Sequence, residues 1–209
     1  MPIIATNAGG DYHNILPPNG NHTAICVRMI HIGTAEFEYK GEKKKQNRVR
    51  LYFELSYEKA TFKAENGEEN FMVSKEYTLS MHEKATLRKD LESWRGKAFT
   101  EEEAKAFDIT VLLGVCCMVN IITKVHEGTG NKYAQIASIS GLPKGMEKPQ
   151  RVNDLFEFSV AEFDEKKFAG LSEYIQERIK QTDEWKAYTK QEAGEIETHS
   201  PNEEDDLPF

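Results

Sequence analysis

The stretch RVRLYFELSY, residues 48–57, alternates in residue character with a period of two. One set of positions is apolar, namely Val49, Leu51, Phe53, Leu55 and Tyr57, and the other set carries Arg48, Arg50, Tyr52, Glu54 and Ser56. Because successive side chains of a strand point to opposite faces, this alternation predicts a strand with one face on a core and one face outward.

Two more strands are predicted next to this one in the sequence. Residues 22–32, HTAICVRMIHI, are rich in β-branched and apolar residues, as strands are. Residues 71–81 alternate again, with only Lys75 out of pattern and with Phe71, Val73, Tyr77, Leu79 and Met81 on one face. Residues 33–47, between the first two strands, are predicted to form a long charged connection.

After residue 81 the period changes to that of a helix. Leu87, Leu91 and Trp94 form one stripe, and Gly96 is a typical helix stop. Thr100 and Glu103 have the spacing of a capping box, which predicts a short second helix. Strands are then predicted at residues 115–125 and 132–140, joined by the turn EGTGN.

The resulting order is β-β-β-α-β-β. It predicts a mainly β fold, a five-stranded oligonucleotide-binding (OB) barrel with a helix between its third and fourth strands. A generic antiparallel α+β domain is the alternative. The predicted parts of the chain are an N-terminal arm (1–21), the OB domain (22–140), a linker with a helical extension (141–190) and a disordered acidic tail (191–209).

The helical extension has an amphipathic pattern of its own. Phe168, Leu171, Ile175 and Ile179 are spaced along one helical face. This face is expected to cover an edge of the barrel or to meet another subunit. From Gln191 onward few apolar residues remain, which is the basis for predicting disorder there.

The net charge of −8 is concentrated at the end of the chain. Residues 191–209 contain no Lys or Arg, and their acids are Glu192, Glu195, Glu197, Glu203, Glu204, Asp205 and Asp206. The rest of the chain is nearly neutral, and residues 40–50 contain Lys40, Lys43, Lys44, Lys45, Arg48 and Arg50 against the single acid Glu42. This asymmetry favours a polyanionic partner.

Several classes of protein find no support in the sequence. The longest apolar run is far shorter than the roughly 20 residues of a membrane helix, and the first residues do not read as a signal peptide. The cysteines form no C-x-x-C pair and the histidines no metal-binding spacing. We therefore expect a cytoplasmic protein that has no cofactor or metal and does not bind a membrane.

The final stretch, EEDDLPF, joins acids to an apolar end. Proline stiffens the backbone, phenylalanine offers a large apolar surface, and a terminal carboxylate adds a charge beside the ring. A partner with an apolar pocket bordered by Arg or Lys suits such a segment. The predicted partner-binding residues are Asp205, Asp206, Leu207, Pro208 and Phe209.

This end resembles that of bacterial and bacteriophage single-stranded DNA-binding proteins, which close with acids followed by Ile/Leu-Pro-Phe; residues 205–209 match position by position. Residues 87–114 also resemble segments of phage replication proteins. The resemblance implies a phage-type protein of the host cytoplasm, whose tail recruits replication and recombination proteins and competes with DNA. A longer arm, a helical extension and the lack of a Gly/Gln/Pro-rich linker set it apart from the bacterial tetramers, although a homo-oligomer is compatible with it.

The predicted DNA-binding surface lies on the polar face of residues 48–57. Lys43, Lys44, Lys45, Arg48 and Arg50 are expected to follow phosphates, Tyr52 and Tyr39 to stack on bases, and Lys132 and Tyr133 to add an opposite wall. In OB barrels this strand and these loops form the binding surface, and stacking tolerates any base. The plain alternative is an ordinary solvated face.

These observations predict a non-enzymatic protein that binds single-stranded DNA without sequence preference in replication or recombination. One alternative is a protein-interaction adaptor with an OB-like domain. A less favoured one is a metal-dependent phage nuclease that uses Glu101, Glu102, Glu103 and Asp108. First-turn acids that favour a helix dipole explain the three glutamates better.

Overall fold

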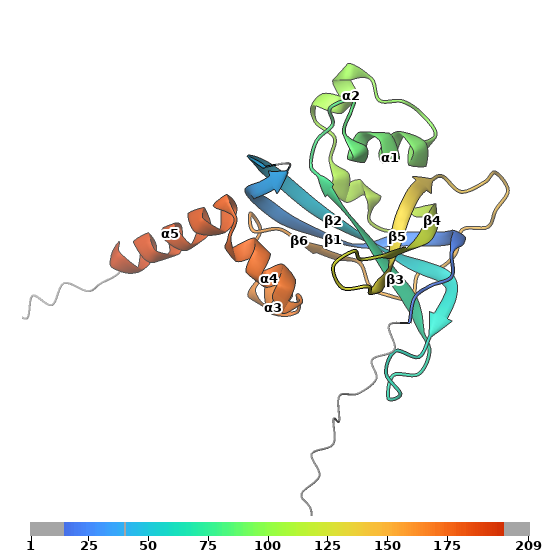
Figure 1. Ribbon diagram of the computed structural model, residues 1–209. Coiled ribbons are helices and arrows are strands. Elements are labelled where there is room, and N and C mark those ends of the chain that lie inside the picture. The colour runs from blue at the N-terminus through green and yellow to red at the C-terminus, as the bar shows by residue number, and fades with distance from the viewer. Residues whose placement is uncertain (1–14, 40, 199–209) are drawn as a thin grey trace, which may run out of the picture.

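The computed structural model describes residues 15–39 and 41–198, except for the side chains of residues 37, 39 and 192–198. Figure 1 shows a twisted sheet with helices above it and to one side. In chain order the elements are β1 (Gly20–Tyr39), β2 (Glu42–Ala60), β3 (Glu69–Thr78), α1 (Thr86–Arg95), α2 (Glu101–Lys105), η1 (Ile109–Leu112), β4 (Cys116–Val125), β5 (Lys132–Ser140), β6 (Phe156–Phe158), α3 (Glu165–Ala169), α4 (Glu173–Lys180) and α5 (Asp183–Thr198).

The fold is mixed α/β, with a mostly antiparallel sheet of six strands. Five strands are in the order β3-β2-β1-β4-β5, and β6 adds a short parallel pairing beside β1. The predicted order β-β-β-α-β-β and the C-terminal helices are confirmed. The sheet is not closed into the predicted five-stranded barrel, because no described ladder joins β3 to β5. Helix α1 contacts both of these strands and bridges the two edges.

The core follows the alternation of β2. Val49, Leu51, Phe53 and Leu55 are at most 1% exposed, and they pack against the helical insert. Leu87, Leu91 and Trp94 of α1 are buried in the same core, as predicted, and the indole of Trp94 donates a hydrogen bond to the carbonyl of Cys116. The predicted helix stop and capping box are also confirmed, since Gly96 has a left-handed φ of 67° and the Thr100 and Glu103 bonds are both made.

The prediction of a charged connection at residues 33–47 is wrong. Strand β1 continues to Tyr39 and β2 begins at Glu42, so the two form a long hairpin ribbon. Opposite charges face each other across it, with Glu36 paired to Lys45 and Glu38 to Lys43. Such cross-strand pairs stabilise a ladder even where neither face of the ribbon lies on a core.

The C-terminal extension builds a second core on the other face of β1. The predicted face Phe168, Leu171, Ile175 and Ile179 is buried there, together with Ile30 and Ile32 of β1 and Phe158 of β6. It therefore covers a face of the sheet at the central strand β1, and not the barrel edge that was expected. Helix α5 continues to Thr198, so disorder predicted for residues 191–198 is replaced by a helix, and residues 199–209 lie outside the described residues.

Candidate nucleic-acid interface

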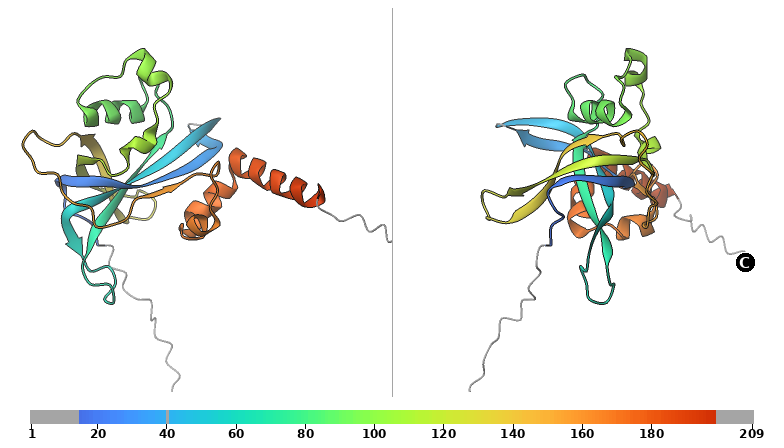
Figure 2. Two further views of the ribbon diagram at one scale, coloured as in Figure 1. Left: turned by 180° about the vertical axis from the view of Figure 1, so that it is seen from behind. Right: turned by 90° about the vertical axis from the view of Figure 1, so that its right-hand side faces the viewer.

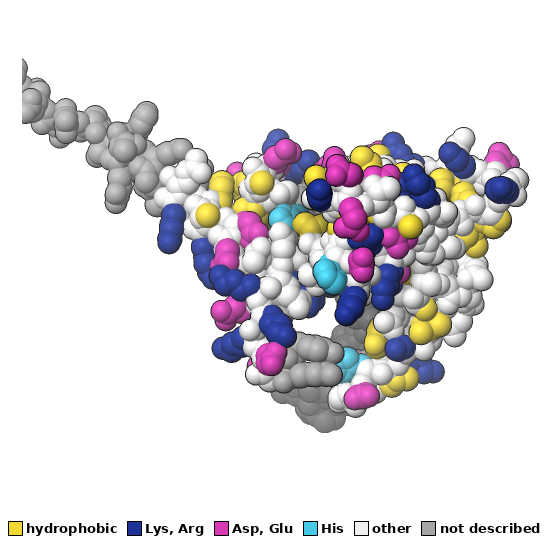
Figure 3. Space-filling model, turned by 90° about the horizontal axis from the view of Figure 1, so that it is seen from above, with side chains coloured by type: hydrophobic (Ala, Val, Ile, Leu, Met, Phe, Trp, Pro, Cys, Tyr) yellow, Lys and Arg dark blue, Asp and Glu magenta, His cyan; other side chains and the backbone are white. Residues whose placement is uncertain are grey.

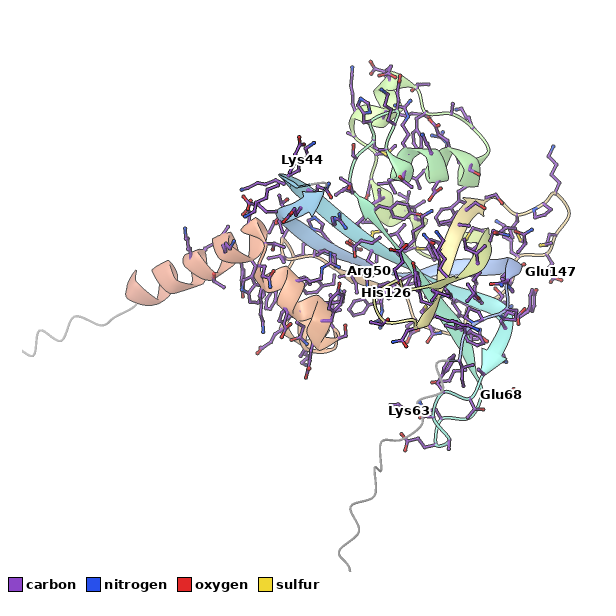
Figure 4. The ribbon with its side chains drawn as sticks, viewed as in Figure 1. Lys44, Arg50, Lys63, Glu68, His126 and Glu147 are labelled. Atoms are coloured by element: carbon purple, nitrogen blue, oxygen red, sulfur yellow. The ribbon has the colours of Figure 1, made fainter. Side chains whose placement is uncertain are left out.

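The face of β2 that points away from the first core carries Arg48, Arg50, Tyr52 and Glu54. Its neighbours on β3 are fixed by register, and Arg50 lies opposite Glu76 while Tyr52 lies opposite Ser74. Figure 4 labels Arg50 on this strand and Lys44 near the end of the β1–β2 hairpin. The alternation that buries Val49 and Leu51 therefore also fixes which basic side chains share the outer face.

Glu76 of β3 binds three arginines. It accepts hydrogen bonds from Arg48 at 2.9 Å, from Arg50 at 2.8 Å and from both terminal nitrogens of Arg178 at 2.7 Å. The side chain of Glu76 is 14% exposed, and those of the arginines are 17–29% exposed. Three cations surround one anion, so the cluster is positive and part of it is open to solvent.

The arginines also determine the titration of Glu76. Burial alone would raise the pKa of this carboxyl group, but the hydrogen bonds from Arg178 and Arg48 and the charge of Arg178 lower its pKa to about 2. The folded state favours the ionised form of Glu76, so ionised Glu76 adds to the free energy of unfolding. This contribution is present above the unfolded pKa of about 4.5 and is lost as pH falls toward 2.

We expect the Glu76→Gln variant to lose less stability in acid than the wild type. Between pH 5 and pH 2 the wild-type free energy of unfolding should fall by about 3 kcal/mol more than that of the variant, since one pKa unit corresponds to about 1.4 kcal/mol. Urea unfolding at several pH values measures the difference. If the free energy of unfolding fell equally with pH in the two proteins, the arginines would not hold Glu76 ionised.

An aromatic ring lies beside this cluster. Tyr174 of α4 is 60% exposed, and its ring centroid is 5.5 Å from the guanidinium carbon of Arg178 and 6.0 Å from that of Arg50. Tyr174 and Arg178 are four residues apart on one helix, so they share a face. Arg50, Arg178 and Tyr174 thus form one cationic and aromatic surface.

A polar hollow adjoins the cluster on the side of α1. It has a volume of about 460 Å³, and its charged or titratable lining residues are Arg48, Glu76, Tyr77, His82 and Lys84. Figure 3 shows that basic and acidic side chains are interspersed over the face seen from above. The charges on that face are therefore mixed in sign.

Two tyrosines, Tyr52 and Tyr39, were predicted to stack on bases, and only the side chain of Tyr52 lies within the described residues. Tyr52 is half-buried against the second core, with the guanidinium carbon of Arg28 at 5.8 Å from its ring centroid. Tyr39 ends β1, and its side chain lies outside the described residues. Tyr174, which sequence reasoning missed, offers a more open ring than Tyr52.

The predicted lysines lie on the exposed β1–β2 ribbon. Lys45 pairs with Asp183 of α5 at 2.8 Å, and Lys44 pairs with Glu42 at 2.7 Å. Both lysines remain about 60% exposed. Lys43, also exposed, has no ion-pair partner within the described part of the chain. The lysines of the ribbon are thus accessible, and they are balanced in number by Glu36, Glu38 and Glu42.

Lys132 and Tyr133 begin β5, at the end of the β4–β5 hairpin. Tyr133 is 42% exposed, and Lys132 is exposed as well. The right-hand view of Figure 2 shows this hairpin and the β1–β2 ribbon projecting to the same side of the molecule. Lys132 and Tyr133 therefore project on the same side of the molecule as the lysines of the ribbon.

Glu54 holds the connection after β5 against the outer face of β2. This side chain is fully buried, and it accepts hydrogen bonds from the backbone N–H groups of Val152 and Asn153 and from the side chains of Asn153 and Asn70, at 2.7–3.0 Å. Burial would raise the pKa of Glu54, but these bonds outweigh it and lower the pKa. This end of the β2 face is therefore covered.

The acids considered for a nuclease site are used at helix starts. Glu103 closes the capping box and pairs with Arg95, and Asp108 caps η1 through Thr110. Within residues 15–39 and 41–198, no group of three or more His, Cys, Asp or Glu side chains is arranged to hold a metal ion. None of the helices described in that part of the chain is long and apolar enough to cross a membrane.

Comparison of the sequence with protein-family models and with curated proteins finds no match. The assignment of the site therefore rests on geometry and on residue chemistry. The predicted partner-binding residues, Asp205, Asp206, Leu207, Pro208 and Phe209, lie outside the described residues.

Three residues of the cluster were missed by sequence reasoning, namely Glu76, Tyr174 and Arg178. The i, i+4 spacing of Tyr174 and Arg178 was the one available signal, because it places both on the polar face of an amphipathic helix. Which strand that face would meet depends on the packing of the second core, and local sequence does not reveal it.

Proposed function

We propose that this protein binds single-stranded DNA without sequence preference and acts in phage DNA replication or recombination in the host cytoplasm. The observation that carries the proposal is the convergence of Arg48, Arg50 and Arg178 on one glutamate, beside the exposed ring of Tyr174. Positive grooves with aromatic platforms are the common means of binding unpaired strands. No catalytic group is needed for this activity.

The sheet supports a finer proposal about the fold, namely that it is an open form of the OB fold. Its strand order is β3-β2-β1-β4-β5, β3 and β5 contact each other without pairing, and helices lie between β3 and β4. OB folds are partly open five-stranded barrels that bind oligonucleotides on the surface of strands two and three. Arg48, Arg50 and Glu76 lie on those two strands.

In this proposal, charge and stacking have separate roles. The arginines attract phosphates, and the lysines of the β1–β2 ribbon extend the positive path, which gives affinity that decreases with salt. Tyr174 offers a face to any base, which gives binding without sequence readout. Glu76 orients the arginines and lowers the total positive charge of the surface.

Removal of the Tyr174 ring is expected to weaken binding by about tenfold, since stacking on one aromatic side chain contributes about 1–3 kcal/mol. The measurement is fluorescence anisotropy with labelled oligonucleotides of several sequences, using Tyr174→Ala. Tyr174→Phe is the matched control and should keep its affinity. A loss confined to one sequence, or an equal loss in both variants, would rule out a general stacking role.

The C-terminal segment is proposed to recruit replication and recombination proteins. Deletion of residues 203–209 should keep or tighten DNA binding, because it removes a competing polyanion, and should abolish recruitment. Pull-downs of candidate replication proteins with the full chain and with the shortened chain test this role. Recruitment that is unchanged by the deletion would argue against it.

A second candidate function is that of a protein-interaction adaptor whose sheet binds no nucleic acid. It is favoured by the pairing of Arg48 and Arg50 with Glu76 and by the packing of Tyr52 against the second core. This candidate predicts capture of partner proteins with no change in the anisotropy of labelled oligonucleotides. The oligonucleotide titration therefore separates the two functions directly.

A further inference from the structure

A second hollow lies where α1 and η1 meet the segment that follows β5. It has a volume of about 1080 Å³, and its floor is formed by buried apolar side chains, namely Leu91, Trp94, Phe99 and Leu112. At its border Val111 is 57% exposed and Val115 is 40% exposed. This volume is slightly above the usual range of about 300–1,000 Å³ for small-molecule sites, so it has room for a short peptide segment.

The charged residues that line this hollow are all basic, namely Arg95, Lys144 and Lys148. Arg95 pairs with Glu103, and its guanidinium carbon lies 4.3 Å from the ring centroid of Phe99. Lys144 and Lys148 are exposed and have no ion-pair partner within the described part of the chain. An apolar floor with unpaired cations at its border suits a ligand that combines an apolar group with acids.

We propose that this hollow binds residues 203–209 of a second copy of the chain. That segment, EEDDLPF, supplies Leu207 and Phe209 for the apolar floor and four consecutive acids for the lysines. Proline between the two apolar residues limits the conformations that the segment loses on binding. The match is thus one of both charge and apolar character.

The direction of α5 favours a second copy as the source of the segment. Figures 1 and 2 show α5 extending away from the sheet to one side, while α1 lies above the sheet. The described chain leaves from the far end of this helix at Thr198, and residues 199–209 can span at most about 40 Å when fully extended. A neighbouring molecule can therefore present its hollow to this segment.

The proposed contact joins two different surfaces, the end of one chain and the hollow of the next. Such head-to-tail contacts are heterologous, and they propagate along a row of molecules unless the rotation closes a ring. The contact does not depend on the proposed DNA binding, since it involves none of the residues of the Glu76 cluster. The same segment cannot bind a hollow and a recruited partner at once, so the two contacts compete.

A labelled peptide of residues 199–209 tests the hollow directly, with the full-length Phe209→Ala chain as receptor so that the chain's own end does not compete. Anisotropy should show saturable binding, and Lys144→Glu with Lys148→Glu in the receptor should weaken it at least tenfold. Lys166→Glu with Lys167→Glu, a matched change on exposed α3 lysines, should leave it unchanged. Equal affinity in both double variants, or no binding, would overturn the proposal.

Cys116 provides a second readout in the unlabelled full chain. Cys116 is one of the residues that line the hollow and is partly exposed, with its thiol directed to the carbonyl of Pro149, whereas Cys26 and Cys117 are fully buried. Alkylation of Cys116 should slow as protein concentration rises, in step with an increase in mass by sedimentation, and Phe209→Ala should remove both effects. Protection of Cys116 in a chain that stays monomeric would show that the chain's own end occupies the hollow, which would contradict the second copy.

Discussion

Replacement of Arg48 and Arg50 by alanine is expected to lower the affinity for single-stranded DNA by about 100-fold. Each charge-assisted hydrogen bond to a phosphate contributes about 1.5–3 kcal/mol, and every 1.4 kcal/mol is a factor of ten in the dissociation constant. Arg178 still pairs with Glu76 in this variant, so the carboxylate is not left alone. Anisotropy titrations with oligonucleotides of different sequence should show the same loss for each.

Two comparisons separate this effect from general damage to the fold. Lys97→Ala with Lys105→Ala removes two positive charges near α2, away from the β2–β3 surface, and should change affinity little. Glu76→Gln removes the negative charge at the centre of the cluster and should tighten binding by several-fold, because the arginines lose a competing anion. Weaker binding by Glu76→Gln at unchanged thermal stability would contradict the proposed role of the arginines.

The second large effect is expected in stability, for Glu54→Ala. Loss of this carboxylate leaves the buried Asn70 amide and the part-buried backbone N–H groups of Val152 and Asn153 without their acceptor. The unsatisfied buried amide costs about 1–3 kcal/mol and each lost bond of a part-buried donor costs less, so the free energy of unfolding should fall by about 2–4 kcal/mol. Urea unfolding followed by circular dichroism measures this change.

The matched control is Glu68→Ala in the β2–β3 hairpin, an exposed position labelled in Figure 4. Its effect should stay within about 0.5 kcal/mol, as is usual for surface substitutions. Glu54→Gln should lie between the two variants, because the amide keeps the shape and one acceptor of the carboxylate. If Glu54→Ala were as stable as Glu68→Ala, the connection after β5 would not be anchored by this residue.

Alternation and helical spacing were sufficient to predict the elements that carry the first core. The period of two at residues 48–57 gave the buried face of β2, and the spacing of Leu87, Leu91 and Trp94 gave that of α1. Both patterns are local consequences of backbone geometry, so they can be read without knowledge of the fold. The spacing of Phe168 and Ile175 predicted the second core for the same reason.

Features set by partners distant in sequence could not be predicted. The β1–β2 ribbon was mistaken for a connection, because its strands are held by cross-strand pairs such as Glu36 with Lys45 and not by burial. The open edge between β3 and β5 depends on where α1 packs. The observed cluster differs from the predicted site for the same reason. The packing of α4 brings Arg178 and Tyr174 to β2 and β3 and leaves Tyr52 half-buried.

The central claim is that the outer face of β2 and β3 binds unpaired strands through charge. Titration of a fluorescent oligonucleotide with the full chain at two salt concentrations tests it most directly. The account predicts binding to single strands in preference to duplex, with a log–log salt slope of about −2 for three phosphates at Arg48, Arg50 and Arg178. No binding at low salt, or an affinity that does not change with salt, would contradict it.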